Sequence, residues 1–226
     1  MRKYKHQFES VLLRRNAHLD VFELGQTPEF LFLLFGGSGI DEEVYWQRST
    51  SIIPVFNNML AKLEDKGLQC VFVHATAPFD IPFNRFPEES HSRQIWNKHV
   101  RTEIVNPWSK LPMIVGGFSG GATLAFSGLH DERNCVGGAV FGADALPVAL
   151  RRPSHWHDKL RWYATPEDRV CNAQVNRRVI ETLVSRDDAE QILLDSGGHS
   201  LADYANSQGI GDAITNAKWS GAIDGN

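Results

Sequence analysis

The residues whose types and spacing most clearly suit a chemical reaction lie in one five-residue segment, Gly117-Phe118-Ser119-Gly120-Gly121. It follows an apolar run, Leu111–Gly116, and precedes a stretch of small residues that suits the start of a helix. A serine on a sharp strand-to-helix turn adopts a strained backbone, with its hydroxyl exposed above the sheet. Glycines two positions before and after it remove side chains that would collide across the turn. The segment predicts that Ser119 is the covalent nucleophile of a hydrolase or an acyl transferase; the alternative is an ordinary Gly-Ser turn.

A serine hydroxyl is a weak nucleophile and needs a base within hydrogen-bonding distance. Among the nine histidines, His199 is the best candidate because it follows the late predicted strand Glu190–Leu194 and the pair Gly197-Gly198, and precedes a predicted helix. His74 also ends a predicted strand, but it precedes Ser119 in the chain. The order nucleophile, acid, histidine is the one expected for a serine on this kind of turn, and it favours His199 as the general base.

A third group must hold the imidazole in the correct tautomer and stabilise its charged form. Asp168 fits because it lies just after the apolar segment Leu160–Ala164 and completes the order serine, acid, histidine. Its rivals are Glu167, one residue away, and Asp144, which follows the preceding apolar segment. We expect Asp168 to be the acid.

Two donors are needed for the negatively charged oxygen of a tetrahedral intermediate. The backbone N–H of Gly120, directly after the nucleophile, is the first candidate, and Gly37 is the second, with Ser38 as the other choice. Gly37 and Ser38 belong to the glycine-rich segment after the apolar run Glu29–Phe35. Such loops also bind phosphates, but this one has neither a Walker lysine nor Gly-x-Gly-x-x-Gly spacing.

The elements expected to position these groups alternate between strands and helices from Glu29 onward. This alternation predicts a mostly parallel sheet with helices on both faces, whose reactive groups lie at the carboxyl ends of the strands. The expected strands are two short ones within Val11–Leu24 around a turn near Asn16, then Glu29–Phe35, Gln69–His74, Leu111–Gly116, Cys135–Phe141, Leu160–Ala164 and Glu190–Leu194. The expected helices are Trp46–Glu64, with Pro54 at its start or at a break, Arg93–Val105, Ala122–Leu129, Val170–Ser185 and Leu201–Trp219.

Composition and charge limit the classes of protein. With no linker or repeat in 226 residues, we expect one domain over residues 1–226. A net charge of −4 with scattered basic pairs argues against nucleic-acid binding. The longest apolar run, Phe30–Phe35, is too short to span a bilayer, and no secretory signal is evident. Three unpatterned cysteines indicate reduced thiols and a cytoplasmic protein.

These segments, in this order, resemble those of the α/β-hydrolase superfamily. Gly117–Gly121 resembles its nucleophile elbow, Thr165–Val170 its acid loop and Gly198-His199 its histidine loop, while Phe35 replaces the histidine that many relatives carry before the oxyanion glycine. The resemblance implies the α/β-hydrolase fold, with a mostly parallel central sheet flanked by helices on both faces. Because only Gly142–Lys159 separates two predicted strands, it also implies little or no cap domain. The compact carboxylesterase, thioesterase and dienelactone-hydrolase-like members are the most similar group.

The function expected from the residues and the resemblance is ester hydrolysis through an acyl-enzyme, with no cofactor and no metal. A thioesterase or a peptidase would use the same residues. A ligand-binding or sensor protein, or a non-hydrolytic acyltransferase or lyase, is the alternative from another class. The expected partner is a small-molecule acyl substrate, and a homodimer is the assembly considered. Phe79, Phe83 and Trp156 are the candidates for the pocket walls.

Overall fold

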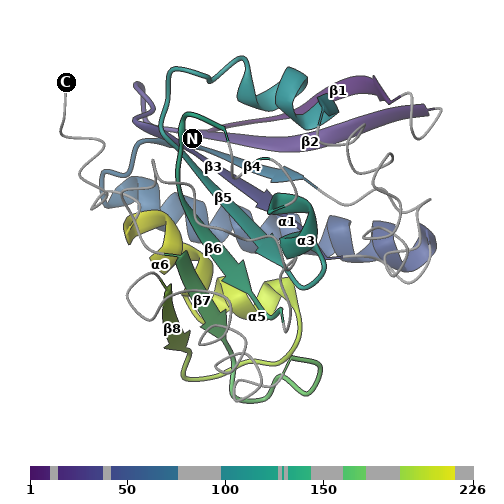
Figure 1. Cartoon of the computed structure of the whole chain (residues 1–226), viewed down its shortest axis with the longest axis vertical. Coiled ribbons are helices and arrows are strands. Elements are labelled where there is room, and N and C mark those ends of the chain that lie inside the picture. The colour runs from purple at the N-terminus through teal and green to yellow at the C-terminus, as the bar shows by residue number, and fades with distance from the viewer. Residues whose placement is uncertain are drawn as a thin grey trace.

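The protein folds around one eight-stranded sheet (Figure 1). A computed structural model describes residues 1–10, 15–37, 42–75, 98–126, 129, 132–143, 160–171 and 189–216. The strands lie in the spatial order β1-β2-β4-β3-β5-β6-β7-β8. β1 pairs antiparallel with β2, β2 pairs antiparallel with β4, and all remaining neighbours pair parallel. Their bounds are β1 Arg2–Ser10, β2 Arg15–Leu24, β3 Phe30–Phe35, β4 Cys70–Ala75, β5 Met113–Phe118, β6 Cys135–Phe141, β7 Leu160–Ala164 and β8 Ala189–Leu193.

The central strands are apolar throughout because both faces of the sheet are covered. Every residue of β3, β4, β5 and β6 is buried. Side chains of a strand alternate between the two faces. In β3, Leu31 and Leu33 enter one hydrophobic core, and Phe32 and Leu34 enter the other. Continuous apolar runs of this kind are typical of parallel sheets that are buried on both sides.

Helices cover each face of the sheet and complete the two cores. α1 (Glu42–Asp65), α5 (Leu201–Asn206) and α6 (Gly209–Thr215) contribute side chains to the core that contains Phe32 (Figure 1). The short helix α3 (Gly121–Ala125) and the π-helical turn η2 (Arg101–Val105) contribute to the core that contains Leu31. The predicted mostly parallel sheet with helices on both faces is therefore confirmed.

Three predicted elements differ from the structure in more than their bounds, while the helix predicted over Ala122–Leu129 is the shorter α3, Gly121–Ala125. The first two strands form a hairpin that begins at Arg2, so the prediction of two short strands around Asn16 is wrong; β1 was missed because it is polar. Pro54 lies inside α1, not at its start or at a break. The predicted closing helix is two helices, because Gln208 adopts a left-handed conformation, with φ 67°, between α5 and α6.

Two other predicted helices are described only in part. The helix expected over Arg93–Val105 is described from Lys98 and ends in the π-helical turn. The helix expected over Val170–Ser185 lies outside the described residues after position 171. Between β6 and β7 there are only residues 142–159, which leaves room for no more than a small cap there.

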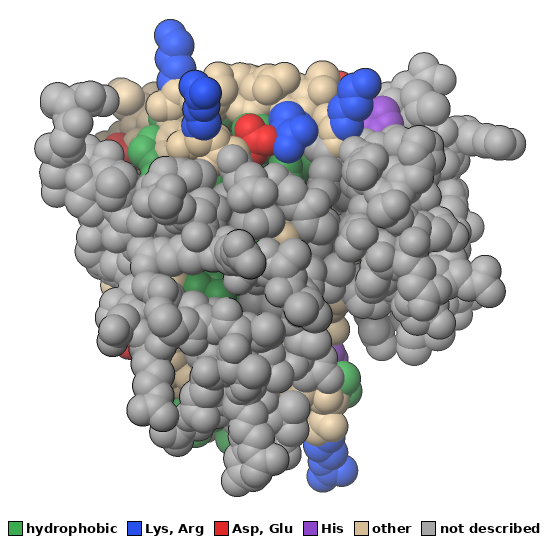
Figure 2. All heavy atoms as spheres, in the orientation of Figure 1, with side chains coloured by type: hydrophobic (Ala, Val, Ile, Leu, Met, Phe, Trp, Pro, Cys, Tyr) green, Lys and Arg blue, Asp and Glu red, His purple; other side chains and the backbone are tan. Residues whose placement is uncertain are grey.

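The sheet edge formed by β1 is basic. Arg2, Lys3 and Lys5 are exposed, and Figure 2 shows lysine and arginine side chains gathered at the top of the view, the side on which β1 and β2 lie. Charged side chains on an edge strand oppose pairing with the strand of another chain. Of the helices that the structure describes, none has the length and apolar character needed to cross a membrane.

Candidate active site

Ser119 lies on a sharp turn between β5 and α3. Its φ is 50°, a left-handed conformation that few residues other than glycine adopt. The turn is held by hydrogen bonds, because the Ser119 N–H donates to the Phe141 carbonyl at 2.8 Å and the Ala122 N–H donates to the Ser119 carbonyl at 3.1 Å. This is the geometry of a nucleophile elbow, in which the serine side chain projects from the end of the strand.

The two flanking glycines make the turn sterically feasible. A Cβ at Gly117 would lie 2.4 Å from the backbone nitrogen of Ala122, and a Cβ at Gly121 would lie 2.4 Å from the carbonyl oxygen of Phe35. Both distances are far below van der Waals contact, and both obstacles are backbone atoms that cannot rotate away. The Gly-x-Ser-x-Gly spacing is therefore a packing requirement of this turn.

His199 reaches Ser119 from the loop that follows β8. Its Nε2 lies 3.2 Å from Ser119 Oγ. The loop bends at Gly197, whose φ of 114° requires glycine, and Ser200 then caps α5 by accepting a hydrogen bond from the Asp203 N–H. A neutral imidazole that carries its proton on Nδ1 leaves Nε2 free to accept the hydrogen of the serine hydroxyl.

Asp168 supplies the partner for that Nδ1 proton. Its Oδ2 lies 2.8 Å from His199 Nδ1, and its side chain is fully buried. The other oxygen, Oδ1, accepts hydrogen bonds from the backbone N–H groups of Val170 at 2.9 Å and Cys171 at 2.7 Å. Two amide donors at one oxygen stabilise the ionised carboxylate without competing for the oxygen that faces the imidazole.

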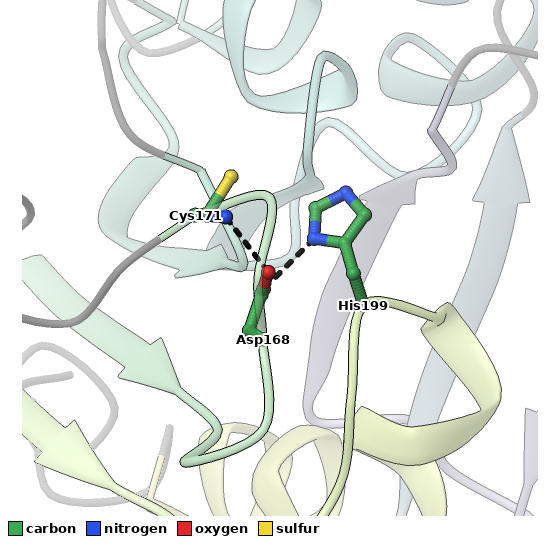
Figure 3. A group of neighbouring side chains, drawn as sticks. All are labelled: Asp168, Cys171 and His199. Atoms are coloured by element: carbon green, nitrogen blue, oxygen red, sulfur yellow. Dashed lines mark hydrogen bonds and ion pairs between the residues drawn. The ribbon is translucent and has the colours of Figure 1, made fainter.

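Asp168, Cys171 and His199 also form the only group of metal-ligand side chains detected in the described part of the chain. One ligand atom from each lies within 4.8 Å of the others. Figure 3 shows the His199 ring facing the Asp168 carboxylate, and the amide nitrogen of Cys171 directed at the same carboxylate. Because two amides, a phenol and the imidazole already engage this carboxylate, the arrangement fits an acid–base pair better than a metal site. The expectation of no metal stays a prediction.

The predicted oxyanion donors flank Ser119 in different ways. Gly120 follows it directly, and Gly37 lies just beyond β3, where a Cβ would come within 2.9 Å of the Phe118 ring. Both glycines are partly accessible. The Gly36 N–H donates to the Ala75 carbonyl at 2.8 Å, which ties this loop to β4.

Not every predicted residue lies in the part of the chain that the structure describes. Ser38, Phe79, Phe83, Trp156 and Asp144 lie outside the described residues, so the predicted pocket walls stay predictions. Glu167, the nearer rival for the acid, is exposed, while its neighbour Asp168 faces the histidine.

Two residues of the site were not found from the sequence. The Tyr204 hydroxyl donates to Asp168 Oδ2 at 3.2 Å. The Phe118 ring lies 5.0 Å from the His199 ring and 5.6 Å from the Tyr204 ring. In the sequence, the only signal for Tyr204 was its position on the predicted helix after His199, and the only signal for Phe118 was its place next to Ser119.

Comparisons with known proteins identify the fold. No protein-family model matches the chain, and no curated protein matches it. Among solved structures, TT1662 from Thermus thermophilus is similar with a TM-score of 0.62 and 13% identity, covering 98% of this chain and all of the other. An alpha-beta serine hydrolase homologue from Coxiella burnetii is similar with a TM-score of 0.59 and 12% identity, covering 96% of this chain and 98% of the other.

A third solved structure extends beyond this chain. Ferric enterobactin esterase from Salmonella typhimurium is similar with a TM-score of 0.66 and 14% identity, and the match covers all of this chain but 60% of that one. These identities are low, so the likeness concerns the fold. The strand order, the turn at Ser119 and the structural neighbours together give one conclusion: the protein has the α/β-hydrolase fold.

Proposed function

We propose that this protein is a serine hydrolase that cleaves a carboxylic ester, with Ser119 as nucleophile, His199 as general base and Asp168 as the acid that orients it. One observation carries the proposal: a continuous series of contacts from Ser119 Oγ to His199 Nε2, at 3.2 Å, and from His199 Nδ1 to Asp168 Oδ2, at 2.8 Å. These three residues come from three different loops, all at the carboxyl ends of parallel strands.

The geometry supports a two-step mechanism through an acyl-enzyme. His199 removes the hydroxyl proton as Ser119 Oγ attacks the ester carbonyl, and the N–H groups of Gly120 and Gly37 stabilise the negatively charged oxygen. His199 then transfers its proton to the departing alcohol, which leaves an acylated serine. Water attacks this acyl group with His199 again acting as base, and release of the carboxylic acid restores the serine. Asp168 stabilises the imidazolium in both steps.

The choice of an ester over a thioester or an amide rests on the comparisons. One solved structure of this fold is named an esterase and another a serine hydrolase homologue. We propose that the substrate is a small-molecule acyl ester. We also propose that residues 1–226 form a single domain. The cytoplasmic location, the homodimer and the pocket residues Phe79, Phe83 and Trp156 remain predictions.

A substrate panel tests this function. Acyl chains of increasing length are presented as p-nitrophenyl esters, as thioesters and as anilides, to the wild type and to Ser119→Ala. The proposal expects multiple turnovers that are fastest for esters and absent in Ser119→Ala. Faster turnover of thioesters or anilides would reassign the substrate class. Stoichiometric binding without turnover would favour a sensor, and transfer of the acyl group to an added alcohol in place of water would favour an acyltransferase.

A further inference from the structure

We propose that Tyr204 is a positioning residue that sets the strength of the Asp168–His199 interaction by donating a hydrogen bond to the carboxylate oxygen that faces the imidazole. The inference rests on the proposed function for its kinetic consequences. The observation behind it is independent of that function: the Tyr204 hydroxyl and His199 Nδ1 share one acceptor, Asp168 Oδ2, at 3.2 Å and 2.8 Å.

The phenol of Tyr204 is held in place by its surroundings. Tyr204 is fully buried on α5, and its ring packs edge-on against Phe141, with centroids 6.0 Å apart. The hydroxyl occupies the space where Gly142 has no side chain, since a Cβ there would lie 2.8 Å from it. Thr165 Oγ lies 3.5 Å from the same hydroxyl and 3.0 Å from the Gly198 carbonyl oxygen, to which it donates. The acid loop, the histidine loop and α5 therefore meet at this phenol.

The phenol remains a proton donor over the pH range in which the enzyme would work. Burial raises the pKa of Tyr204 above its ordinary value, because the charged phenolate is poorly solvated there. A neutral phenol can donate its hydrogen to the carboxylate, and a donor at Oδ2 withdraws negative charge from the atom that holds the imidazolium. Tyr204 should therefore weaken the attraction between the Asp168 carboxylate and the imidazolium that forms on His199 when it accepts a proton.

Other polar groups near the histidine do not share this oxygen. In the described part of the chain, the nucleophile Ser119 faces Nε2, and the amide of Cys171 donates to the opposite carboxylate oxygen. The nearby carboxylate of Asp203 accepts a hydrogen bond from the Ser200 hydroxyl at 2.7 Å. Tyr204 is thus the side chain whose loss changes the environment of Oδ2 most directly.

The test compares Tyr204→Phe with the wild type and with a matched control, Tyr163→Phe. Tyr163 is buried in the same core, stacks on Phe141 and donates its hydroxyl to the carboxylate of Asp212 at 2.6 Å, away from the site. In Tyr204→Phe we expect the acidic limb of kcat/KM against pH to move to higher pH by about half a unit, because the imidazolium is then held more strongly. We expect KM to stay unchanged. Tyr163→Phe should leave the limb in place.

A second measurement and a second variant keep the inference testable by other routes. The downfield proton resonance of His199 Nδ1–H can be followed by NMR against pH without any need for catalysis. In Tyr204→Phe, the midpoint of this titration should move to higher pH, as the acidic limb does. The hydroxyl of 3-fluorotyrosine is more acidic than that of tyrosine and is a stronger donor. Its incorporation at position 204 should move the acidic limb and the midpoint of the NMR titration to lower pH. A residue that only fills space would not give shifts of opposite sign for the two changes.

The outcomes separate this inference from the proposed function. An unmoved limb and resonance in Tyr204→Phe, or equal movement in Tyr163→Phe, would overturn the role of Tyr204 while leaving the hydrolase intact. Absence of ester turnover in the wild type would reject the proposed function, and the NMR titration would still decide whether Tyr204 controls the Asp168–His199 pair.

Discussion

The backbone strain at Ser119 leads to a prediction about stability. If the elbow holds a residue at φ 50° against its preference, glycine at this position should be more stable than alanine. Ser119→Gly and Ser119→Ala both lack the hydroxyl that contacts His199, so comparing the two isolates the backbone conformation. The left-handed conformation costs a residue with a Cβ about 1.5 kcal/mol. The greater freedom of glycine in the unfolded chain offsets about 0.7 kcal/mol of this.

The expected difference is therefore about 1 kcal/mol in favour of Ser119→Gly, or about 2–4 °C in Tm for a chain of this length. Urea and thermal unfolding followed by circular dichroism measure it. Gln208, with φ 67°, is a positive control away from the site, since Gln208→Gly should also be more stable than Gln208→Ala. Asn216, with φ −80°, is the negative control, and its glycine variant should be the less stable one. If Ser119→Gly were no more stable than Ser119→Ala while Gln208 behaved as expected, the elbow would not store strain.

The remaining predictions concern packing, the acid and alkaline pH. Gly121→Ala places a Cβ 2.4 Å from a strand carbonyl oxygen and should lower the free energy of unfolding by more than about 2 kcal/mol. In the control Gly116→Ala, the Cβ meets only side-chain atoms at 3.4 Å, and the free energy of unfolding should fall by less than about 1 kcal/mol. Urea unfolding measures both values. Asp168→Asn should retain the fold but lower kcat for the preferred ester by about 10³–10⁴-fold, since the imidazole loses its orienting charge; an unchanged kcat would remove Asp168 from the mechanism. Burial raises the pKa of both Tyr163 and Tyr204, so these phenols contribute stability that is present below pH 10 and is lost as the pH rises further. Tyrosinate absorbance at 295 nm, compared between the wild type and the variants Tyr163→Phe and Tyr204→Phe, should show both phenols titrating only as the protein unfolds. A reversible titration near pH 10 in the folded wild type that one of these variants removes would contradict the burial of that phenol.

The central strands β3, β4, β5 and β6 could be predicted because they are buried on both faces. β6 and β7 have the predicted bounds, and β3, β4, β5 and β8 are shifted by one or two residues at their ends. The shift at β5 has a clear cause, because the strand continues through Gly116 and Gly117 up to Phe118. Composition predicts the end of a strand at such glycines, but backbone pairing with β3 and β6 extends it to the elbow.

The loop order predicted which side chains meet at the site. Ser119, Asp168 and His199 follow different strands, and parallel pairing brings those strand ends to the same edge of the sheet. Tyr204 could not be predicted in the same way. Its hydroxyl reaches Asp168 through tertiary packing, in the space that Gly142 leaves without a side chain.

The hairpin and the broken closing helix were missed for opposite reasons. β1 is held by its pairing with β2 at the sheet edge, so its polar sequence carries no burial pattern that could be recognised. The closing segment does carry a helical pattern, but Gln208 in a left-handed conformation splits it, and nothing in the residue type indicates this.

Covalent labelling of Ser119 tests the central claim most directly. A fluorophosphonate reacts with a serine only when a base activates the hydroxyl and the oxyanion donors stabilise the product. The proposed site predicts one label per chain, mapped by mass spectrometry to the peptide that contains Ser119, and complete loss of labelling in Ser119→Ala. Labelling at another residue, equal labelling of Ser119→Ala, or a folded wild type that takes up no label would contradict the claim that Ser119 is an activated nucleophile.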